Sequence, residues 1–427
     1  MGLYGLSPVS LESNLRACVR FRVRCRSWPT EKEMSAFDFI RDIWIGAGLS
    51  APPFVQRAII PILHKAKEAA RLLVRPYLPV YELRGQGQGG PLTVTYIGLE
   101  FARPNLEALL YVDKPEEQRR GQVPFWRCGE WVESLATDIV VVSAANQLIR
   151  SLPCRNAIIL PEFIHHIVDV RGDWQDVYNR IHKNARTGEL RRAIKLGYEY
   201  VISHDKNDFD EFYTHMYLPT MQARHGEAAL PTPPGEAYQY FRHGGLFWIK
   251  RDGTFVSGAV YQPQQDVINA RIAGVRNADA QLMREGAAAM VYYMVLQWAN
   301  QHGYRAVNFL GTAPYLSSGL FQHKRRWGAR LSIPSYLYRQ IWIKVQHNTP
   351  AVAQFLKDNP FVVMDKSGQL QGLIFTDDPH NVPAEVLRDW ENRYITPGLS
   401  SLVIRSVSRF IQGPLDDNCA DLVIPIP

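Results

Sequence analysis

The sequence predicts a mixed α/β protein in which helices pack on a mixed sheet. Two observations indicate this class. Between residues 79 and 345, short apolar stretches of strand length alternate with helical segments. Within this part, a three-strand pattern is followed by a long apolar helix at 286–301 and by a short strand at 306–310. With 427 residues the chain is also too long for one ordinary core, so we expect more than one domain.

The composition is that of a globular protein, with 46% hydrophobic and 21% charged residues. The five cysteines are scattered and contain no C-x-x-C pair. This usage is typical of a reducing cytoplasm and argues against a disulfide framework or a cysteine metal site. The net charge of +7 favours anionic partners such as a nucleotide, tRNA or a phospholipid surface, while plain solubility explains it equally well.

The N-terminal part is predicted to be a basic, helical extension that covers residues 1–78. It has no apolar h-region with a cleavage site, and no window of the chain reaches the ~20 apolar residues that span a bilayer. We therefore expect a cytoplasmic protein. A helix predicted over Phe54–Leu73 carries Lys65, Lys67 and Arg71, so peripheral contact with an anionic membrane stays open beside docking on the main body.

Residues 79–197 are expected to form the first of two lobes. The glycine-rich GQGQGG lacks the Lys-Ser/Thr pair of a phosphate loop, so a hairpin turn is the better interpretation. His165 and His166 have no acidic or cysteine companion at metal-ligand spacing, so we expect strand histidines and no metal site. Strands are predicted over Val80–Arg84, Leu92–Ile97, Ala108–Val112, Asp138–Ser143, Asn156–Leu160 and His166–Val170.

The first lobe ends with a helix predicted over Asp173–Lys195, whose second half is densely basic. Such a run usually marks a solvated face. Because nearly all its charges have one sign, a wall that faces an anionic ligand is an equal alternative. Between residues 180 and 195 the single acid Glu189 stands against Arg180, His182, Lys183, Arg186, Arg191, Arg192 and Lys195.

Residues 198–345 are expected to form the second lobe. Two short turns join its three strands into an antiparallel meander. Residues 346–427 are predicted to be a C-terminal tail with a helix over Pro350–Leu356, a hairpin around 366–368 and an irregular end. The elements predicted for the second lobe are helices over Lys206–Arg224 and Gly235–His243, strands over Leu246–Lys250, Thr254–Gln262 and Val267–Val275, the helix 286–301, the strand 306–310 and a further strand within Leu331–Val345.

Three groups of residues carry a family resemblance. They are Asn184-Ala185-Arg186 with Arg191-Arg192 and Gly197-Tyr198, then Gln297-Trp298-Ala299 with Asn308-Phe309-Leu310-Gly311, and Gly319-Leu320-Phe321 with Lys324 and Trp327-Gly328-Ala329. Together with the order of elements over residues 80–345, they resemble the GNAT acyltransferase fold. The match is closer to its FemAB-like branch, which includes peptidoglycan aminoacyl transferases and the so-called BioF2-like acetyltransferases.

The resemblance implies two GNAT-like lobes side by side, with an acyl-donor cleft in the C-terminal lobe. It also implies an acyltransferase without a tightly bound cofactor, with acyl-CoA, acyl carrier protein or aminoacyl-tRNA as co-substrate. The segment Gln281–Ala288 departs from a standard GNAT pyrophosphate loop, since Met283 takes the place of a polar residue. His323 and Trp327 stand where the branch usually has phenylalanine.

The chemistry of amide formation guides the choice of site residues. The donor must be held, the amine must lose a proton, and the oxyanion must be stabilised. We expect Lys324 to contact the donor phosphate or the oxyanion, and Glu285 and Tyr315 to be the candidate base and acid. Residues expected to bind the donor, at a helix start and in the basic segment, are Arg284, Gly286, Ala287, Arg325 and Arg326. Those expected on the acceptor or anion-binding side are Arg186, Arg191, Arg192 and His225.

Three functions stay open at this stage. The first is an N-acyltransferase that acts on an amino group of a cell-envelope, polysaccharide or lipid precursor. The second is tRNA-dependent aminoacyl transfer of the FemAB type, which the basic helix favours. The third is an inactive GNAT scaffold that binds a partner or membrane surface, with residues 1–78 as the docking arm. A serine or zinc hydrolase is disfavoured because neither G-x-S-x-G nor H-E-x-x-H occurs.

Overall fold

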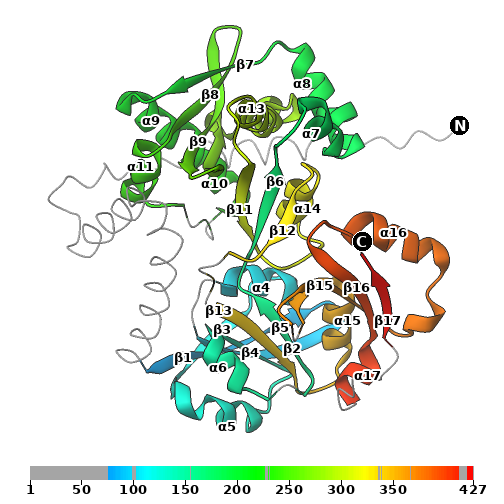
Figure 1. Ribbon diagram of the computed structural model, residues 1–427. Helices are drawn as coiled ribbons and strands as arrows, with labels where there is room; N and C mark the ends of the chain where they lie inside the picture. The colour runs from blue at the N-terminus through cyan, green and yellow to red at the C-terminus, as the bar shows by residue number, and fades with distance from the viewer. Residues whose placement is uncertain are drawn as a thin grey trace, which may run out of the picture. The chain divides into compact units, whose positions relative to one another are not determined.

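The computed structural model confirms a mixed α/β protein with three sheets (Figure 1). The predictions for residues 1–75, including the helix Phe54–Leu73, lie outside the described residues. The structure describes residues 76–98, 102–153, 155–226, 229, 231–334, 337, 339–365, 367–412 and 421–426.

The first sheet has six strands in the order β3-β1-β2-β4-β13-β5. The β2–β4 pair is parallel and the other pairs are antiparallel. Helices lie on both faces, which explains why β4 is buried at every position and reads as a continuous apolar run. The strands are β1 (Tyr77–Gly87), β2 (Gly90–Gly98), β3 (Glu116–Pro124), β4 (Ile139–Ala145), β5 (Ala157–Pro161) and β13 (Arg339–Val345).

The second sheet has seven strands in the order β12-β6-β11-β10-β9-β8-β7. The predicted meander forms its centre as β8, β9 and β10, which are antiparallel to one another. Along β8, Phe247 and Ile249 face one core while Leu246 and Trp248 face another, as the two-residue period of a strand requires. The strands are β6 (Ile164–Asp169), β7 (Glu199–Ser203), β8 (Gly245–Arg251), β9 (Thr254–Gln264), β10 (Val267–Val275), β11 (Ala306–Thr312) and β12 (Arg330–Ser332).

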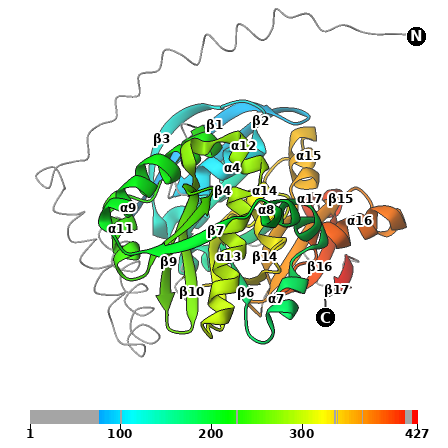
Figure 2. The same cartoon turned by 90° about the horizontal axis from the view of Figure 1, so that it is seen from above.

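Helix α13 (Ala287–Gln301) lies on this sheet in the predicted place, against β8 to β11 (Figure 2). The predicted helix Asp173–Lys195 breaks after α7 (Trp174–Arg180), and its second part, residues 183–195, is called the basic helix. Apolar residues surround α13 because the basic helix packs on its other side. The opposite face of the sheet is covered by a nearly continuous helix from Lys206 to His225 and by α11.

Strands β10 and β11 are parallel neighbours only at their beginning. They pair at three positions, from Val267 with Ala306 to Asn269 with Asn308. Beyond this point β10 has an irregularity against β9 between Ala270 and Ile272. The far end of β10 contacts a helix instead, since Thr220 Oγ1 hydrogen-bonds both the N–H and the C=O of Val275. The two strands therefore separate as they continue.

The third sheet shows that residues 346–427 are more than a tail. The helix and the hairpin predicted there are present, as α15 and the β14–β15 pair. The end predicted to be irregular instead adds a parallel strand and an antiparallel edge strand, because the apolar run at 399–406 pairs with β15. The strands, in sheet order, are β14 (Phe361–Met364), β15 (Leu370–Thr376), β16 (Leu399–Ser406) and β17 (Leu422–Pro425).

Helices and short helical turns connect these strands. The prediction of a strand over Ala108–Val112 is wrong, because most of this segment belongs to α4, which begins at Arg103 with a proline in its first turn. The helices are α4 (Arg103–Leu110), α5 (Cys128–Glu133), α6 (Asn146–Ser151), α7 (Trp174–Arg180), α8 (Arg191–Lys195), α9 (Lys206–Phe212), α10 (Leu218–His225), α11 (Pro234–Arg242), α12 (Ala280–Arg284), α14 (Gly319–Arg325), α15 (Pro350–Asp358), α16 (Ala384–Tyr394) and α17 (Val407–Gln412). The π-helical turns are Ala185–Leu190 and Tyr213–Tyr217, and the 3-10 turns are Phe125–Arg127, Arg276–Ala278 and Pro379–Asn381.

The sheets do not follow the predicted lobe ranges 79–197 and 198–345. Strand β6 lies in the first range but belongs to the second sheet, between β12 and β11. Strand β13 lies in the second range but fills the place between β4 and β5 in the first sheet. A local hydrophobic pattern identifies a strand but not the strand beside it. The placement of β6 in the second sheet and of β13 in the first therefore could not be predicted from the sequence.

We predict that Ala289→Leu destabilises the protein. Ala289 is 2% exposed where α13 packs on the second sheet, and a larger side chain there overpacks the contact by about 1–3 kcal/mol. Urea unfolding measures the change. The matched control is Ala384→Leu on the exposed start of α16, which should leave stability nearly unchanged. Equal stability of both variants would contradict the packing described for α13.

Candidate functional site

The end of β11 has an unusual backbone. Leu310 is in the left-handed region with φ of 61°, and the pairing with β6 shifts between Asn308 and Gly311. Asn308 stabilises this bend, because its Oδ1 accepts a hydrogen bond from the Leu310 N–H at 2.9 Å. The bend turns the carbonyl groups of residues 309–311 towards α14.

Lys324 fills the space that these carbonyls surround. Its Nζ donates to Phe309 O at 2.6 Å and Gly311 O at 3.0 Å, and lies 3.4 Å from Leu310 O. Ser318 starts α14 by accepting a hydrogen bond from the Phe321 N–H, which sets the helix so that Lys324 points inward. The side chain is 6% exposed, and burial lowers the pKa of its ammonium to about 7, with Arg224 adding to the effect.

Aromatic side chains pack around His323, the residue before Lys324 on α14. The ring of Tyr292 on α13 stacks on Trp327 at 5.2 Å and meets the ring of His323 edge-on at 4.9 Å. Burial, together with the positive charges of Arg224 and Lys324, lowers the pKa of His323 to about 4. His323 is therefore a neutral imidazole at neutral pH, able to accept a hydrogen bond.

A chain of buried polar groups lies beside the bend. Asn308 Nδ2 donates to Asn269 Oδ1 at 3.0 Å, across the last paired position of β10 and β11. It also lies 3.1 Å from Nδ1 of His165. With the amide oriented as drawn, Nδ1 must be the acceptor, which requires His165 to be neutral. His166 on the same strand contacts Thr312 Oγ1 through Nε2 at 2.9 Å.

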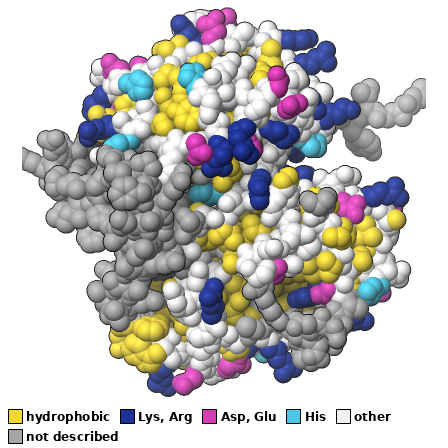
Figure 3. All heavy atoms as spheres, in the orientation of Figure 1, with side chains coloured by type: hydrophobic (Ala, Val, Ile, Leu, Met, Phe, Trp, Pro, Cys, Tyr) yellow, Lys and Arg dark blue, Asp and Glu magenta, His cyan; other side chains and the backbone are white. Residues whose placement is uncertain are grey.

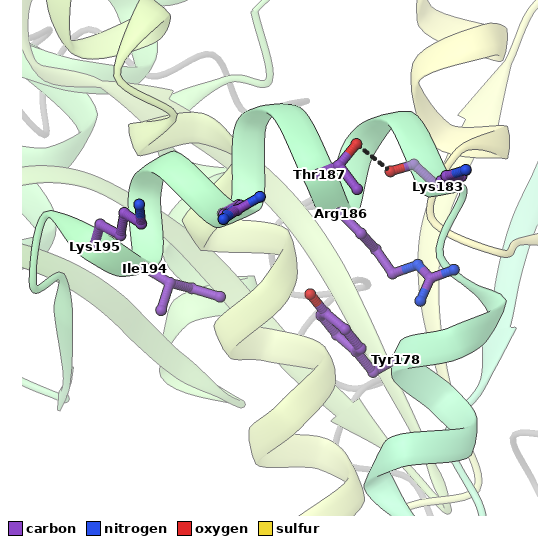
Figure 4. A pocket seen from close by; sticks show the side chains of 7 residues that line it. Tyr178, Lys183, Arg186, Thr187, Ile194 and Lys195 are labelled. Atoms are coloured by element: carbon purple, nitrogen blue, oxygen red, sulfur yellow. Dashed lines mark hydrogen bonds between the residues drawn. The ribbon is translucent and has the colours of Figure 1, made fainter.

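A groove runs along the basic helix at residues 183–195, with a volume of about 520 Å³ (Figure 4). We call it the basic groove. Among the described residues that line it none is acidic, so its charge is wholly positive. Lys and Arg side chains gather around this part of the face in Figure 3. The lining residues are Tyr178, Lys183, Arg186, Thr187, Arg191, Ile194 and Lys195.

Arg186 occupies the middle of the basic groove. One Nη donates to Asn179 Oδ1 at 3.0 Å, and the guanidinium lies 5.6 Å from the centre of the Tyr178 ring. Its Nε is buried and has no hydrogen-bond partner among the described residues. The helix is a π-turn at this point, a distortion that often accompanies functional sites. Arg186 as a whole is partly exposed and lines the groove.

A second pocket, of about 300 Å³, lies between α14 and α16, and we call it the α14–α16 pocket. Arg326 is exposed there, whereas Arg325 donates to the carbonyls of Asn392 and Ile395 and so ties the two helices together. These are the places of the two arginines expected to bind the donor. The lining residues are His182, Asn184, Ser317, Gln322, Arg325, Arg326, Asn392, Arg393 and Tyr394.

The first turn of α13, where Gly286 and Ala287 were expected to bind the donor, is covered by the basic helix. Gly286 has φ of 90°, and a Cβ on it would lie 3.0 Å from Ala193 Cβ and 3.2 Å from Glu189 O. Ala287 is fully buried in the same contact. Arg192 also points here, since it donates to the carbonyl of Arg284 at 2.9 Å. The basic helix covers the first turn of α13, so Gly286 serves the packing of the chain itself.

The structure does not bring the candidate base and acid together with Lys324. Glu285 forms an ion pair with Arg251 and accepts from Gln281, and the bond to Arg251 holds its pKa below the usual value. Tyr315 is 2% exposed in the core between the first and third sheets, where burial raises its pKa. Both lie outside the site described here. The side chain of His225 lies outside the described residues.

The sequence predicted Arg186 and Arg191 as anion-binding residues, and Lys183 and Lys195 as part of the basic run, but not the groove that they line. Lys183, Thr187, Arg191 and Lys195 repeat every four residues, a spacing that places them on one helix face and could have identified the groove. Tyr292 gave no such signal, because its ring meets His323 and Trp327 only through tertiary packing. Among the described residues, no cluster of His, Cys, Asp or Glu could hold a metal ion, and no helix is long and apolar enough to cross a bilayer.

Comparisons with known proteins give similarity at the level of solved structures. No family model matches the sequence, and no curated protein matches it. The chain is similar to FemX at 12% identity and a TM-score of 0.35, over 71% of this chain and 96% of that one. It is also similar to a domain assigned to a lysylphosphatidylglycerol synthetase from Agrobacterium fabrum, at 13% identity and a TM-score of 0.31, over 65% and 84% of the two chains.

A third similar structure is a GCN5-related N-acetyltransferase from Anabaena variabilis. It has 10% identity and a TM-score of 0.26, over 77% of this chain and 74% of that one.

We predict that stability falls as the pH drops from about 6.5 towards 4, partly through the buried histidines. Burial, with Lys324 nearby, lowers the pKa of His165 to about 4 and of His166 to about 3. In this window the histidine is protonated in the unfolded chain and neutral in the folded chain. Each such histidine therefore lowers the free energy of unfolding by about 1.4 kcal/mol for each unit by which the pH falls. Above about pH 6.5 the contribution is complete.

Urea unfolding between pH 7.5 and 4.5 measures this dependence. His166→Asn should show a smaller loss of stability on acidification than the wild type. His380→Asn, which changes an exposed histidine, should follow the wild type. Identical pH profiles for all three proteins would show that His166 is not held neutral.

Proposed function

We propose that the protein is an amide-forming acyltransferase. It moves an acyl group from an activated donor, acyl-CoA or acyl carrier protein, to an amino group of a cell-envelope, polysaccharide or lipid precursor. The observation that carries the proposal is the arrangement at the end of β11, where two parallel strands separate beside the buried ammonium of Lys324.

Separated strands suit an extended donor. Where the pairing of β10 and β11 stops, backbone N–H and C=O groups lose their strand partner. An extended arm that contains amide groups can pair with such strand edges. The pantetheine arm shared by coenzyme A and acyl carrier protein has this chemistry. The phosphates of the donor would be attracted by the positive charge of the basic groove.

The proposed reaction is attack of a neutral amine on the acyl carbonyl. A C–N bond forms, the carbonyl oxygen becomes an oxyanion, and the C–S bond to the donor breaks as the oxyanion collapses. The amine proton passes to the leaving thiolate, so that the products are the amide and the free thiol. The neutral imidazole of His323, next to Lys324 in the chain, is assigned the role of accepting a hydrogen bond from the amine. The positive charge of Lys324 stabilises the oxyanion.

A second function is favoured by the basic groove. Aminoacyl-tRNA is also an activated acyl donor, with an ester in place of the thioester. A groove lined by four cations with no acid among its described residues is suited to a phosphodiester backbone. Mass spectrometry of ligands that co-purify with the protein, searching for coenzyme A, acyl carrier protein or tRNA, separates the two donors.

We predict that Lys324→Met lowers acyl transfer at least tenfold, because one charge-assisted contact of about 1.5–3 kcal/mol is lost. It should also lower the melting temperature, since the carbonyls of Phe309 and Gly311 lose their donor. Thioester cleavage by the purified protein measures the activity. The control is Lys357→Met, which changes a more exposed lysine on α15. A fully active Lys324→Met variant rules out the assigned role, and a wild type without any cleavage favours an inactive scaffold.

We predict that Arg186→Glu with Arg191→Glu weakens donor binding and flattens its salt dependence. Both arginines line the basic groove, and a polyanionic ligand releases fewer counterions when they are reversed. Binding of acyl-CoA and of aminoacyl-tRNA should be titrated between 50 and 300 mM salt, about the range over which screening changes strongly. Arg150→Glu on α6 is the matched control. If the salt slope of the double variant equals that of the control, the groove does not hold the donor.

A further inference from the structure

The α14–α16 pocket has the properties of an anion site. Its walls come from three parts of the chain, which are α14, the segment 182–184 at the start of the basic helix, and the C-terminal end of α16. Helix α16 belongs to residues 346–427, outside the segment that carries the family resemblance. Its charged lining residues, Arg325, Arg326 and Arg393, are all basic, and His182 adds a fourth nitrogen donor or acceptor.

Hydrogen bonds between its walls hold the α14–α16 pocket in shape. Arg325 donates to the carbonyls of Asn392 and Ile395 on the α16 side. Gln322, one helical turn earlier on α14, donates to the carbonyl of Arg393 at 2.9 Å. These bonds fix the end of α16 against α14. A backbone hydrogen bond fixes the segment 182–184 against α14, since the His182 N–H donates to the carbonyl of Arg326 at 2.7 Å.

The charges inside the pocket are available. Arg325 is occupied by the bonds that hold the walls, but Arg326 is exposed and forms no ion pair within the described part of the chain. Arg393 contacts Asp389 at 3.2 Å, and both side chains are more than half exposed, so an anion can replace this surface pair. The pKa of His182 is lowered by burial and by Arg325, Arg326 and Arg186, which shows that one positive field extends over both pockets.

We propose that the α14–α16 pocket binds a phosphate or diphosphate group, as a second anion site beside the basic groove. A volume of about 300 Å³ is at the lower end of ligand pockets, which suits a phosphate-bearing fragment better than a whole cofactor. The segment His182–Asn184, at the start of the basic helix, borders both sites, since Lys183 lines the basic groove. The site assigns a binding role to the C-terminal part of the chain and does not depend on acyl transfer.

The test is calorimetric titration of the full chain with inorganic pyrophosphate. Arg326→Gln combined with Arg393→Gln should weaken binding at least tenfold. Arg388→Gln is the matched control, because it removes an exposed arginine of α16 that does not line the pocket. Unchanged melting temperatures show that the variants fold.

Two further arms identify the source of the phosphate. Titration with ADP tests a soluble nucleotide, and flotation with phosphatidylglycerol vesicles tests a lipid headgroup. Loss of either interaction in the double variant supports the site. The proposal is overturned if pyrophosphate does not bind the wild type, or if its binding survives Arg326→Gln with Arg393→Gln and is lost only in the Arg186 and Arg191 variants. Thioester cleavage by these proteins tests the proposed function separately.

Discussion

The contact on which the site depends is the one between the ammonium of Lys324 and the carbonyls at the end of β11. A buried cation is costly unless its hydrogen bonds are satisfied, and here Phe309 and Gly311 supply acceptors. The carbonyls converge only because Leu310 adopts a left-handed conformation, which Asn308 holds through its side chain. The same Asn308 links β11 to β10 and to β6. One amide and one ammonium therefore fix where the strands separate and where α14 lies.

The histidines around this contact follow from its charge. His165, His166 and His323 are buried near Lys324, and both burial and the positive charge lower each pKa. They remain neutral at neutral pH, so they act as hydrogen-bond partners and not as additional cations. Because the pKa of Lys324 is lowered to about 7, its ammonium is partly charged near neutral pH, and the arginines supply the remaining positive charge. Under the proposed function, an oxyanion would meet this positive field.

The sequence predicted the parts of the fold that have strong local signals. Helix α13, predicted over 286–301 and found over Ala287–Gln301, was located to within one residue because its apolar residues are continuous. The meander was recognised because its turns are short and polar. The placement of β13 between β4 and β5 was not predictable, since any partner would satisfy its apolar pattern. For the site, Lys324 was found through a motif. The burial of Tyr315 and the pairing of Glu285 depend on residues far away in the sequence, which no local pattern encodes.

The basic helix shows how one amphipathic segment can serve packing and charge together. Its small and apolar residues Ala185, Leu190 and Ala193 face α13, and the absence of a side chain at Gly286 lets the two helices touch. This close contact leaves no space for an anion at the first turn of α13, so the backbone N–H groups there cannot be the phosphate site. The cations that line the basic groove, Arg186 among them, become the alternative. Under the proposed function, the positive side chains of the basic groove would hold the donor phosphates in place of the backbone N–H groups at the start of α13.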